Sequence, residues 1–163
     1  MKRLFACIVF ALAPLGAHAN TDLAKQWGAE ATRLSEQTMT MIHTLDMGQT
    51  TEVSERFALD VYRFGRTSAD LARWIDQSDG PNDLGCIFRG MAKESETQLI
   101  SLETDFDILA QRDSLTRLAG MFADAEIISI AAQRRSPSTG RVVATLKDSC
   151  TAQPQRISAI RGF

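Results

Sequence analysis

The chain has 163 residues, of which 44% are hydrophobic and 23% are charged, and its formal net charge at pH 7 is −2. A mildly acidic chain without a block of basic residues argues against nucleic-acid binding and against strong adsorption to an anionic membrane. The length lies within the usual range for one domain with a single core.

The first segment, residues 1–19, has the three-part layout of a secretory signal peptide. Lys2 and Arg3 form a basic start, residues 4–15 are mostly apolar, and residues 17–19 read Ala-His-Ala. The apolar run is shorter than the roughly 20 residues that span a bilayer, so no stable membrane insertion is expected. Cleavage would leave 144 residues, with 16 basic and 20 acidic side chains, in the periplasm or outside the cell.

Apolar residues at three- and four-residue steps predict two helices, over 22–46 and 52–76. The first stripe consists of Leu23, Trp27, Ala31, Leu34, Met41, Ile42 and Leu45. The second consists of Val53, Phe57, Val61, Phe64, Leu71 and Ile75. Gly48 breaks the pattern between them, and Thr51 is expected to cap the second helix. The turn-forming run 76–81 ends it.

Two further helices are predicted, one from a cap at Asn82 or Asp83 to about Ala110, and one over 114–134 capped by Asp113. The residues expected to be buried in the third helix are Leu84, Ile87, Phe88, Met91, Leu99, Leu102, Phe106 and Leu109. Those in the fourth are Leu115, Leu118, Met121, Phe122, Ile127, Ile128 and Ile130. Because the fourth helix is apolar on almost every side, it is predicted to be the most buried.

Four long helices joined by short links predict an all-α, up-and-down four-helix bundle over residues 20–150. Val142, Val143 and Leu146 predict a short C-terminal helix or extension, because a single strand there would have no partner. Residues 151–163 are expected to form a flexible tail.

Cys86 and Cys150 are the two cysteines that remain after cleavage. In an oxidising compartment such a pair is most simply a disulfide. It would close a loop of about 65 residues. By lowering the entropy of the unfolded chain, such a cross-link would stabilise the fold by about 4 kcal/mol. Two free thiols or a bridge between chains are the alternatives.

A single histidine, His43, remains in the mature chain. A di-iron bundle needs Glu-x-x-His on two helices, and a zinc site needs three or four converging Cys or His ligands. The Cys-x-x-Cys-His of covalent haem and the Gly-x-Ser-x-Gly of many hydrolases are absent. We therefore expect no enzyme activity, no metal and no cofactor. Haem held by His43 and a distant methionine is the alternative that these motifs leave open.

Eight side chains are candidates for contact with a partner or ligand. Two of them, Asp124 and Glu126, lie inside an apolar stretch, where a buried carboxylate would need a cation. The cations on other predicted helices are Arg63, Arg66 and Arg89. Aromatic residues with a polar edge are enriched at interfaces. The candidates of this kind are Trp27, Tyr62 and Trp74. Such residues are also common at the boundary of a core, which is the alternative interpretation.

These features favour a non-catalytic exported protein that binds a protein partner in the cell envelope, for example as an inhibitor or immunity-type protein. The alternative is a small-molecule or haem carrier with a cavity between its helices, lined by Met91, Phe106, Met121 and Phe122. An enzyme is the third hypothesis, disfavoured by the missing catalytic motifs. The oligomeric state is left open.

Overall fold

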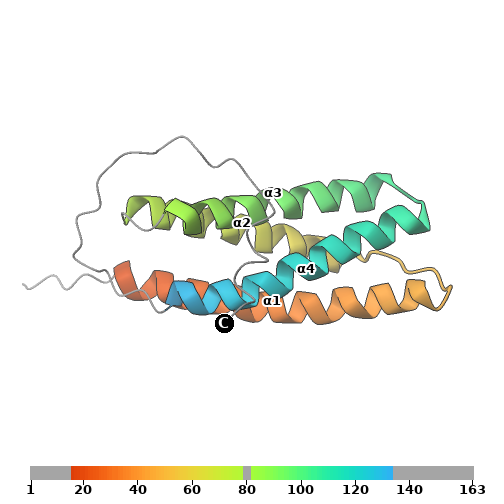
Figure 1. Cartoon of the computed structure of the whole chain (residues 1–163), viewed down its shortest axis with the longest axis horizontal. Coiled ribbons are helices and arrows are strands. Elements are labelled where there is room, and N and C mark those ends of the chain that lie inside the picture. The colour runs from red at the N-terminus through yellow and green to blue at the C-terminus, as the bar shows by residue number, and fades with distance from the viewer. Residues whose placement is uncertain (1–15, 79–81, 134–163) are drawn as a thin grey trace, which may run out of the picture.

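Four helices make up the part of the chain that the structure, a computed structural model, describes: residues 16–78 and 82–133. They are α1 (Gly16–Asp46), α2 (Glu55–Gln77), α3 (Asn82–Thr104) and α4 (Ile108–Gln133), and no strand occurs among these residues. Consecutive helices run in opposite directions, and α4 returns beside α1 (Figure 1). The prediction of an all-α four-helix bundle is confirmed.

Several predictions fall on residues outside the described ranges. These are residues 1–15 of the predicted signal peptide 1–19, the C-terminal helix or extension, the tail 151–163, and Cys150. Cys86 is half-buried near the start of α3, and its disulfide with Cys150 stays a prediction. Among the described residues, no helix is both long enough and apolar enough to cross a membrane.

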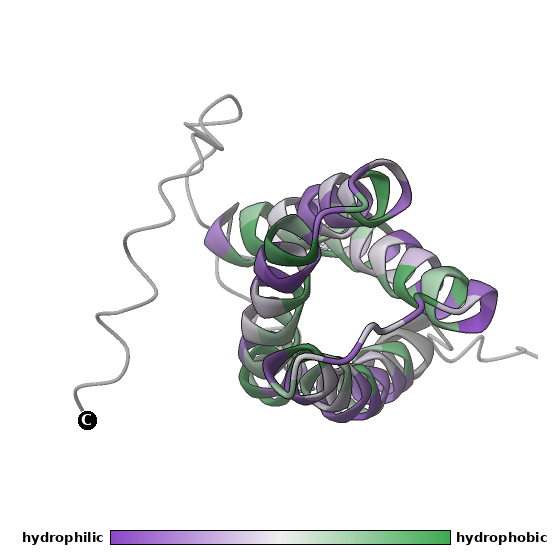
Figure 2. Ribbon diagram, turned by 90° about the vertical axis from the view of Figure 1, so that its right-hand side faces the viewer, coloured by the Kyte–Doolittle hydropathy of each residue, from purple (hydrophilic) through white to green (hydrophobic). Residues whose placement is uncertain are grey.

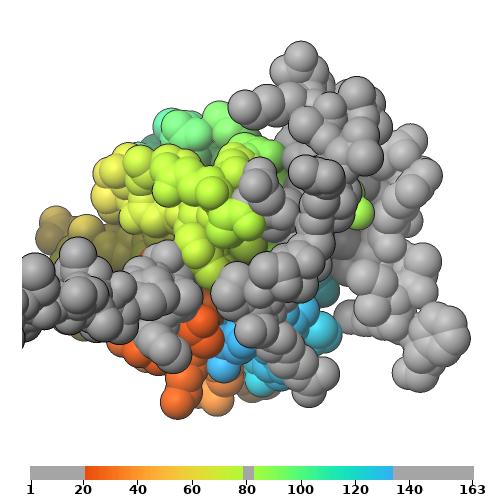
Figure 3. All heavy atoms as spheres, turned by 90° about the vertical axis from the view of Figure 1, so that its left-hand side faces the viewer, coloured from red at the N-terminus to blue at the C-terminus, as the bar shows by residue number. Residues whose placement is uncertain are grey.

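The bundle consists of two close helix pairs, α1 with α4 and α2 with α3. The pairs face each other across two wider seams, one between α1 and α2 and the other between α3 and α4. Figure 3 looks at one end of the bundle, where the end of α4 lies beside the start of α1. Small residues allow the close approach. A Cβ added to Gly28 of α1 would lie 2.5 Å from the Cβ of Ser129 in α4. A Cβ added to Gly65 of α2 would lie 3.0 Å from the Cβ of Ser95 in α3.

The core, which the four helices surround (Figure 2), contains large aromatic rings from every helix, with two from α2, Phe57 and Phe64. Trp27 of α1 stacks on Phe64 of α2 with ring centroids 4.9 Å apart, and meets Phe88 of α3 edge-on at 5.1 Å. Phe64 meets Phe122 of α4 edge-on at 5.1 Å. The indole Nε1 of Trp27 donates to Ser68 Oγ at 2.8 Å, which satisfies its buried polar edge. These rings join the two close pairs.

The second helix begins at Glu55, later than predicted, because Ser54 and not Thr51 is its N-cap. Ser54 has an extended backbone, and its hydroxyl accepts a hydrogen bond from the Phe57 N–H at 3.2 Å. This bond satisfies one of the N–H groups that the first helical turn leaves free. Gly48, with φ of 72°, forms the turn after α1 as expected.

The third helix ends at Thr104 and not near Ala110, and the predicted cap of the fourth helix at Asp113 is wrong. Asp107 caps α4, because its carboxylate accepts a hydrogen bond from the Ala110 N–H at 3.1 Å. The break between the helices therefore lies several residues earlier than the apolar pattern indicates.

Four side chains that were predicted to be buried are exposed. Phe106 is 83% exposed because it lies in the turn between α3 and α4, and Leu109, in the first turn of α4, is exposed as well. Ile127, which is 62% exposed, and Ile130 lie on the outer face of α4. The prediction that this helix is the most buried is wrong, because nine of its 26 residues are buried, compared with nine of 23 in α2. Every other residue expected on the four apolar stripes is buried or half-buried.

We expect Gly28→Ala to lower the free energy of unfolding by about 1–3 kcal/mol, the usual cost of an overpacked core, because the added Cβ overlaps Ser129. Gly120→Ala is the matched control, since nothing in the described ranges lies within 4 Å of a Cβ added there. It should raise the free energy of unfolding by roughly 0.5–1 kcal/mol through helix propensity. Urea titrations followed by tryptophan fluorescence measure both. Equal effects of the two variants would contradict the close approach of α1 and α4.

Candidate functional site

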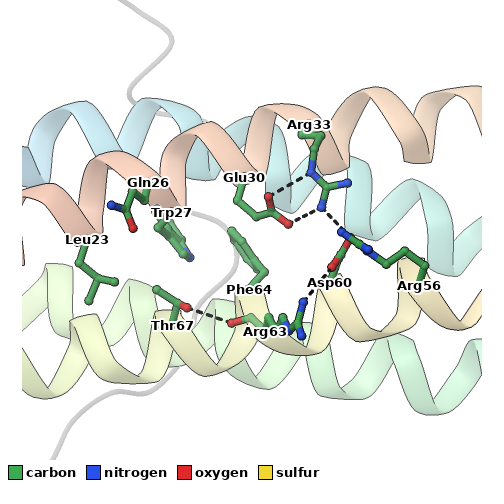
Figure 4. Close-up of a pocket in the computed structure, with 10 residues that line it drawn as sticks. All are labelled: Leu23, Gln26, Trp27, Glu30, Arg33, Arg56, Asp60, Arg63, Phe64 and Thr67. Carbon is green, nitrogen blue, oxygen red and sulfur yellow. Dashed lines mark hydrogen bonds and ion pairs between the residues drawn. The ribbon is translucent and has the colours of Figure 1, made fainter.

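The seam between α1 and α2 opens as a cleft with a volume of about 440 Å³. The side chains that line it are Leu23, Gln26, Trp27, Glu30, Arg33, Arg56, Asp60, Arg63, Phe64 and Thr67. Figure 4 shows the charged side chains gathered toward one end and Leu23, Gln26 and Trp27 toward the other. We call the charged end the charged half, which consists of Glu30, Arg33, Arg56, Asp60 and Arg63.

Asp60 is the buried centre of the charged half, with only 3% of its surface exposed. It follows Phe57 by three residues and precedes Phe64 by four, so it lies on the same face of α2 as these two buried rings. A carboxylate at such a position loses its hydration and must be paired. The burial of Asp60 therefore requires cations nearby.

Three arginines supply the pairing of Asp60. Arg33 of α1 donates from Nη2 to Asp60 Oδ2 at 2.8 Å, and Arg56 of α2 donates from Nε to the same oxygen at 3.1 Å. Arg63 Nη1 lies 3.7 Å from Asp60 Oδ1, a longer ion pair. Arg56 and Arg63 reach the carboxylate because helix positions three and four residues apart are neighbours. Arg33 reaches it across the seam and so links α1 to α2.

Glu30 holds Arg33 in position from the same helix. Arg33 Nε donates to Glu30 Oε2 at 3.0 Å, and its Nη2 contacts Glu30 Oε1. The hydrogen bond with Glu30, assisted by Asp60, outweighs partial burial and raises the pKa of Arg33 above its usual range. With three arginines and two carboxylates, the charged half carries a net charge of +1 at neutral pH.

Burial by itself would raise the pKa of Asp60, but hydrogen bonds from Arg56 and Arg33 outweigh burial and hold this pKa below its ordinary value. The carboxylate is therefore ionised at neutral pH. Because the pKa of Asp60 is lower in the folded chain than in the unfolded chain, the pairing stabilises the fold fully at pH values above about 4, the pKa of an unfolded carboxyl group. That stability is lost as the pH falls through the folded pKa.

Arg56 and Arg63 present unused hydrogen-bond donors to solvent. Their side chains are 79% and 63% exposed. Within the described ranges, Arg56 uses only Nε in a hydrogen bond, and the guanidinium of Arg63 makes none. Since a guanidinium carries five N–H donors, each of these two arginines can bind a further oxygen atom.

Of the eight residues proposed from the sequence, Trp27 and Arg63 line the cleft. Trp27 is buried, so its ring forms part of the wall of the cleft and of the core. Tyr62 and Arg66 are exposed on α2 and do not line the cleft. The cleft thus contains one of the expected cations and one of the expected aromatic rings.

The other four proposed residues lie elsewhere. Trp74 is half-buried near the end of α2. Arg89 of α3 donates to Asp76 of α2 at 2.7 Å. Asp124 is half-buried and Glu126 is exposed on the outer face of α4, so the pair does not form a buried polar cavity. The eight residues do not form one site.

Sequence reasoning missed Glu30, Arg33, Arg56 and Asp60. The signal that points to them is Asp60, a carboxylate on the apolar stripe between Phe57 and Phe64. Arginines lie four residues before it and three residues after it. A charge on an apolar helix face, with opposite charges at helical spacing, marks a buried ion pair.

The geometry also bears on the haem and carrier hypotheses. His43 is exposed near the end of α1. In the part of the chain that the structure describes, no group of three or more His, Cys, Asp or Glu side chains is arranged to hold a metal ion. Met91, Met121 and Phe122 are buried in the core, whereas Phe106 is on the surface and does not line an internal cavity.

Asp60→Asn should lower the free energy of unfolding at pH 7 by about 1–3 kcal/mol, the usual cost of losing hydrogen bonds to a buried charge. The difference from the unsubstituted protein should begin to shrink as the pH falls below about 4, where the unfolded carboxyl group binds a proton, and should vanish only below the lowered pKa of the folded chain. Urea titrations at pH 7 and pH 3 measure both effects. Asp22→Asn, at an exposed position of α1, is the control. A difference that stays constant with pH would contradict the pairing of Asp60.

Comparisons with protein-family models, with curated proteins and with solved structures found no match to this chain. Its function therefore has to be inferred from its own residues. In the cleft, those residues offer ion pairing and directed N–H donors, which is the chemistry of recognising an anionic group.

Proposed function

We propose that this protein is a non-catalytic binding protein, exported to the periplasm or the medium, that holds a protein partner of the cell envelope in the α1–α2 cleft. The observation that carries the proposal is the charged half, where three guanidinium groups surround one buried carboxylate. Arginine is enriched among the residues that dominate the binding energy of protein interfaces.

The cleft has the rigidity that a recognition site needs. Its walls are two helices joined by the stacked rings of Trp27 and Phe64. Arg33 is clamped between Glu30 and Asp60, so it has little freedom left to lose on binding. Groups that are already ordered reduce the entropic cost of association.

The predicted signal peptide at residues 1–19 supports a role outside the cytoplasm. A small exported bundle that works by binding fits an inhibitor or an immunity-type protein, which need only cover the surface of their target. In either role the cleft would hold a segment of the target protein.

A small-molecule ligand is the second candidate, because the cleft of about 440 Å³ is as large as many small-molecule pockets. Such pockets usually enclose most of the surface of their ligand. Since this cleft is partly open to solvent, a protein segment is the better fit.

Filling the cleft should abolish capture of the partner. Thr67→Trp places a bulky ring at a residue that lines the cleft, and Thr97→Trp makes the same change on the exposed surface of α3. The two threonines are matched, since each donates to the carbonyl four residues earlier, at 3.0 Å and 2.9 Å. The measurement is affinity capture from an envelope extract with exported, purified protein, followed by mass spectrometry.

We expect one protein to be recovered in near-equal amount by the unsubstituted chain and by Thr97→Trp, and to be lost with Thr67→Trp. Recovery that is equal for all three would contradict the assignment of the cleft. If no protein is recovered and native mass spectrometry detects a retained small molecule, the second candidate is correct.

A further inference from the structure

Resting on the proposed function, we infer that the charged half of the cleft binds a carboxylate side chain from an acidic segment of the partner, with Arg56 and Arg63 as the direct contacts. Asp60 is a positioning residue in this arrangement. Its buried carboxylate fixes the Nε edge of Arg56 and leaves the terminal nitrogens of that arginine available.

The two arginines are placed to act together. Both belong to α2, on either side of Asp60, and both line the cleft. Arg63 lies at 3.7 Å from Asp60, so its guanidinium can turn toward an incoming oxygen without breaking a short hydrogen bond. A planar carboxylate matches the paired N–H groups of a guanidinium, which bind its two oxygens at once.

The charge balance selects a carboxylate over a phosphate. The charged half carries +1, from Arg33, Arg56 and Arg63 against Glu30 and Asp60. One carboxylate brings this charge to zero, whereas a phosphate monoester with a charge near −2 would leave an unpaired negative charge beside a buried Asp60. The whole chain has a formal charge of −2, so this positive site contrasts with the overall acidity of the protein.

The inference is tested with ¹⁵N-labelled full-length protein, exported and purified, titrated with acetylated and amidated hexaglutamate at low salt. The readout is the Nε–H signals of Arg56 and Arg63. We expect saturable shifts of both signals, weakened by added salt, and no shifts with hexaglutamine, which has the same length without the charge. Inorganic phosphate should bind more weakly than hexaglutamate.

Substitutions distinguish binding at the cleft from non-specific electrostatic attraction of the acidic peptide. Arg56→Gln and Arg63→Gln together should weaken hexaglutamate binding at least about tenfold, since each removes a charge-assisted hydrogen bond. Arg73→Gln removes a charge from an exposed position of the same helix outside the cleft and should leave the affinity unchanged. Arg63→Gln alone removes no hydrogen bond that the described residues make, so its fold should be intact.

Equal binding of hexaglutamine, tighter binding of phosphate, or equal losses from Arg73→Gln and from the cleft variants would each overturn the inference. This failure can be told apart from failure of the proposed function. If the envelope partner is lost with Thr67→Trp but retained by Arg56→Gln and Arg63→Gln, the cleft binds a protein without using a carboxylate.

Discussion

A carboxylate placed on the apolar face of a helix must find cations or destabilise the fold, and Asp60 imposes this constraint on the whole α1–α2 seam. Two of its partners come from its own helix at neighbouring positions, but Arg33 comes from α1. The seam therefore cannot close on apolar side chains alone. It is held by the ion-pair cluster and, about one helical turn away, by the stacked rings of Trp27 and Phe64, and the cleft lies between α1 and α2 along this seam.

The two close helix pairs complement this arrangement. Gly28 against Ser129 and Gly65 against Ser95 bring each pair together with almost no side chain between the backbones. The larger volume of the aromatic rings is then accommodated between the pairs, where Trp27 meets Phe64. Small residues within the pairs and large residues between them make the α1–α2 seam wide enough to carry a binding site.

The fold was largely predictable, because the apolar stripes at helical spacing identified four helices and most of the core. The boundary between α3 and α4 was not, since it depends on which aspartate caps the helix. Asp107 and Asp113 are both plausible caps, and only the hydrogen bond to Ala110 N–H distinguishes them. The early break exposes Phe106, which the periodic pattern placed in the core.

The site was harder to predict than the fold. Charged residues on a helix usually face water, so Asp60 was not among the candidate residues, and its partner Arg33 is 27 positions away in the sequence. Periodicity within a helix cannot reveal a pairing between helices. Arg63 was identified as a useful cation, but its partner is Asp60 and not a carboxylate of α4.

Asp60 and Arg33 form one coupled unit across the seam, and a double-mutant cycle measures the coupling between them. The free energy of unfolding would be measured at pH 7 for the unsubstituted chain, Arg33→Gln, Asp60→Asn and the double variant. We predict a coupling energy of about 1–3 kcal/mol, because either single change leaves a charged partner behind. Effects that add to within about 0.5 kcal/mol would show that the two side chains act independently and are not coupled across the seam.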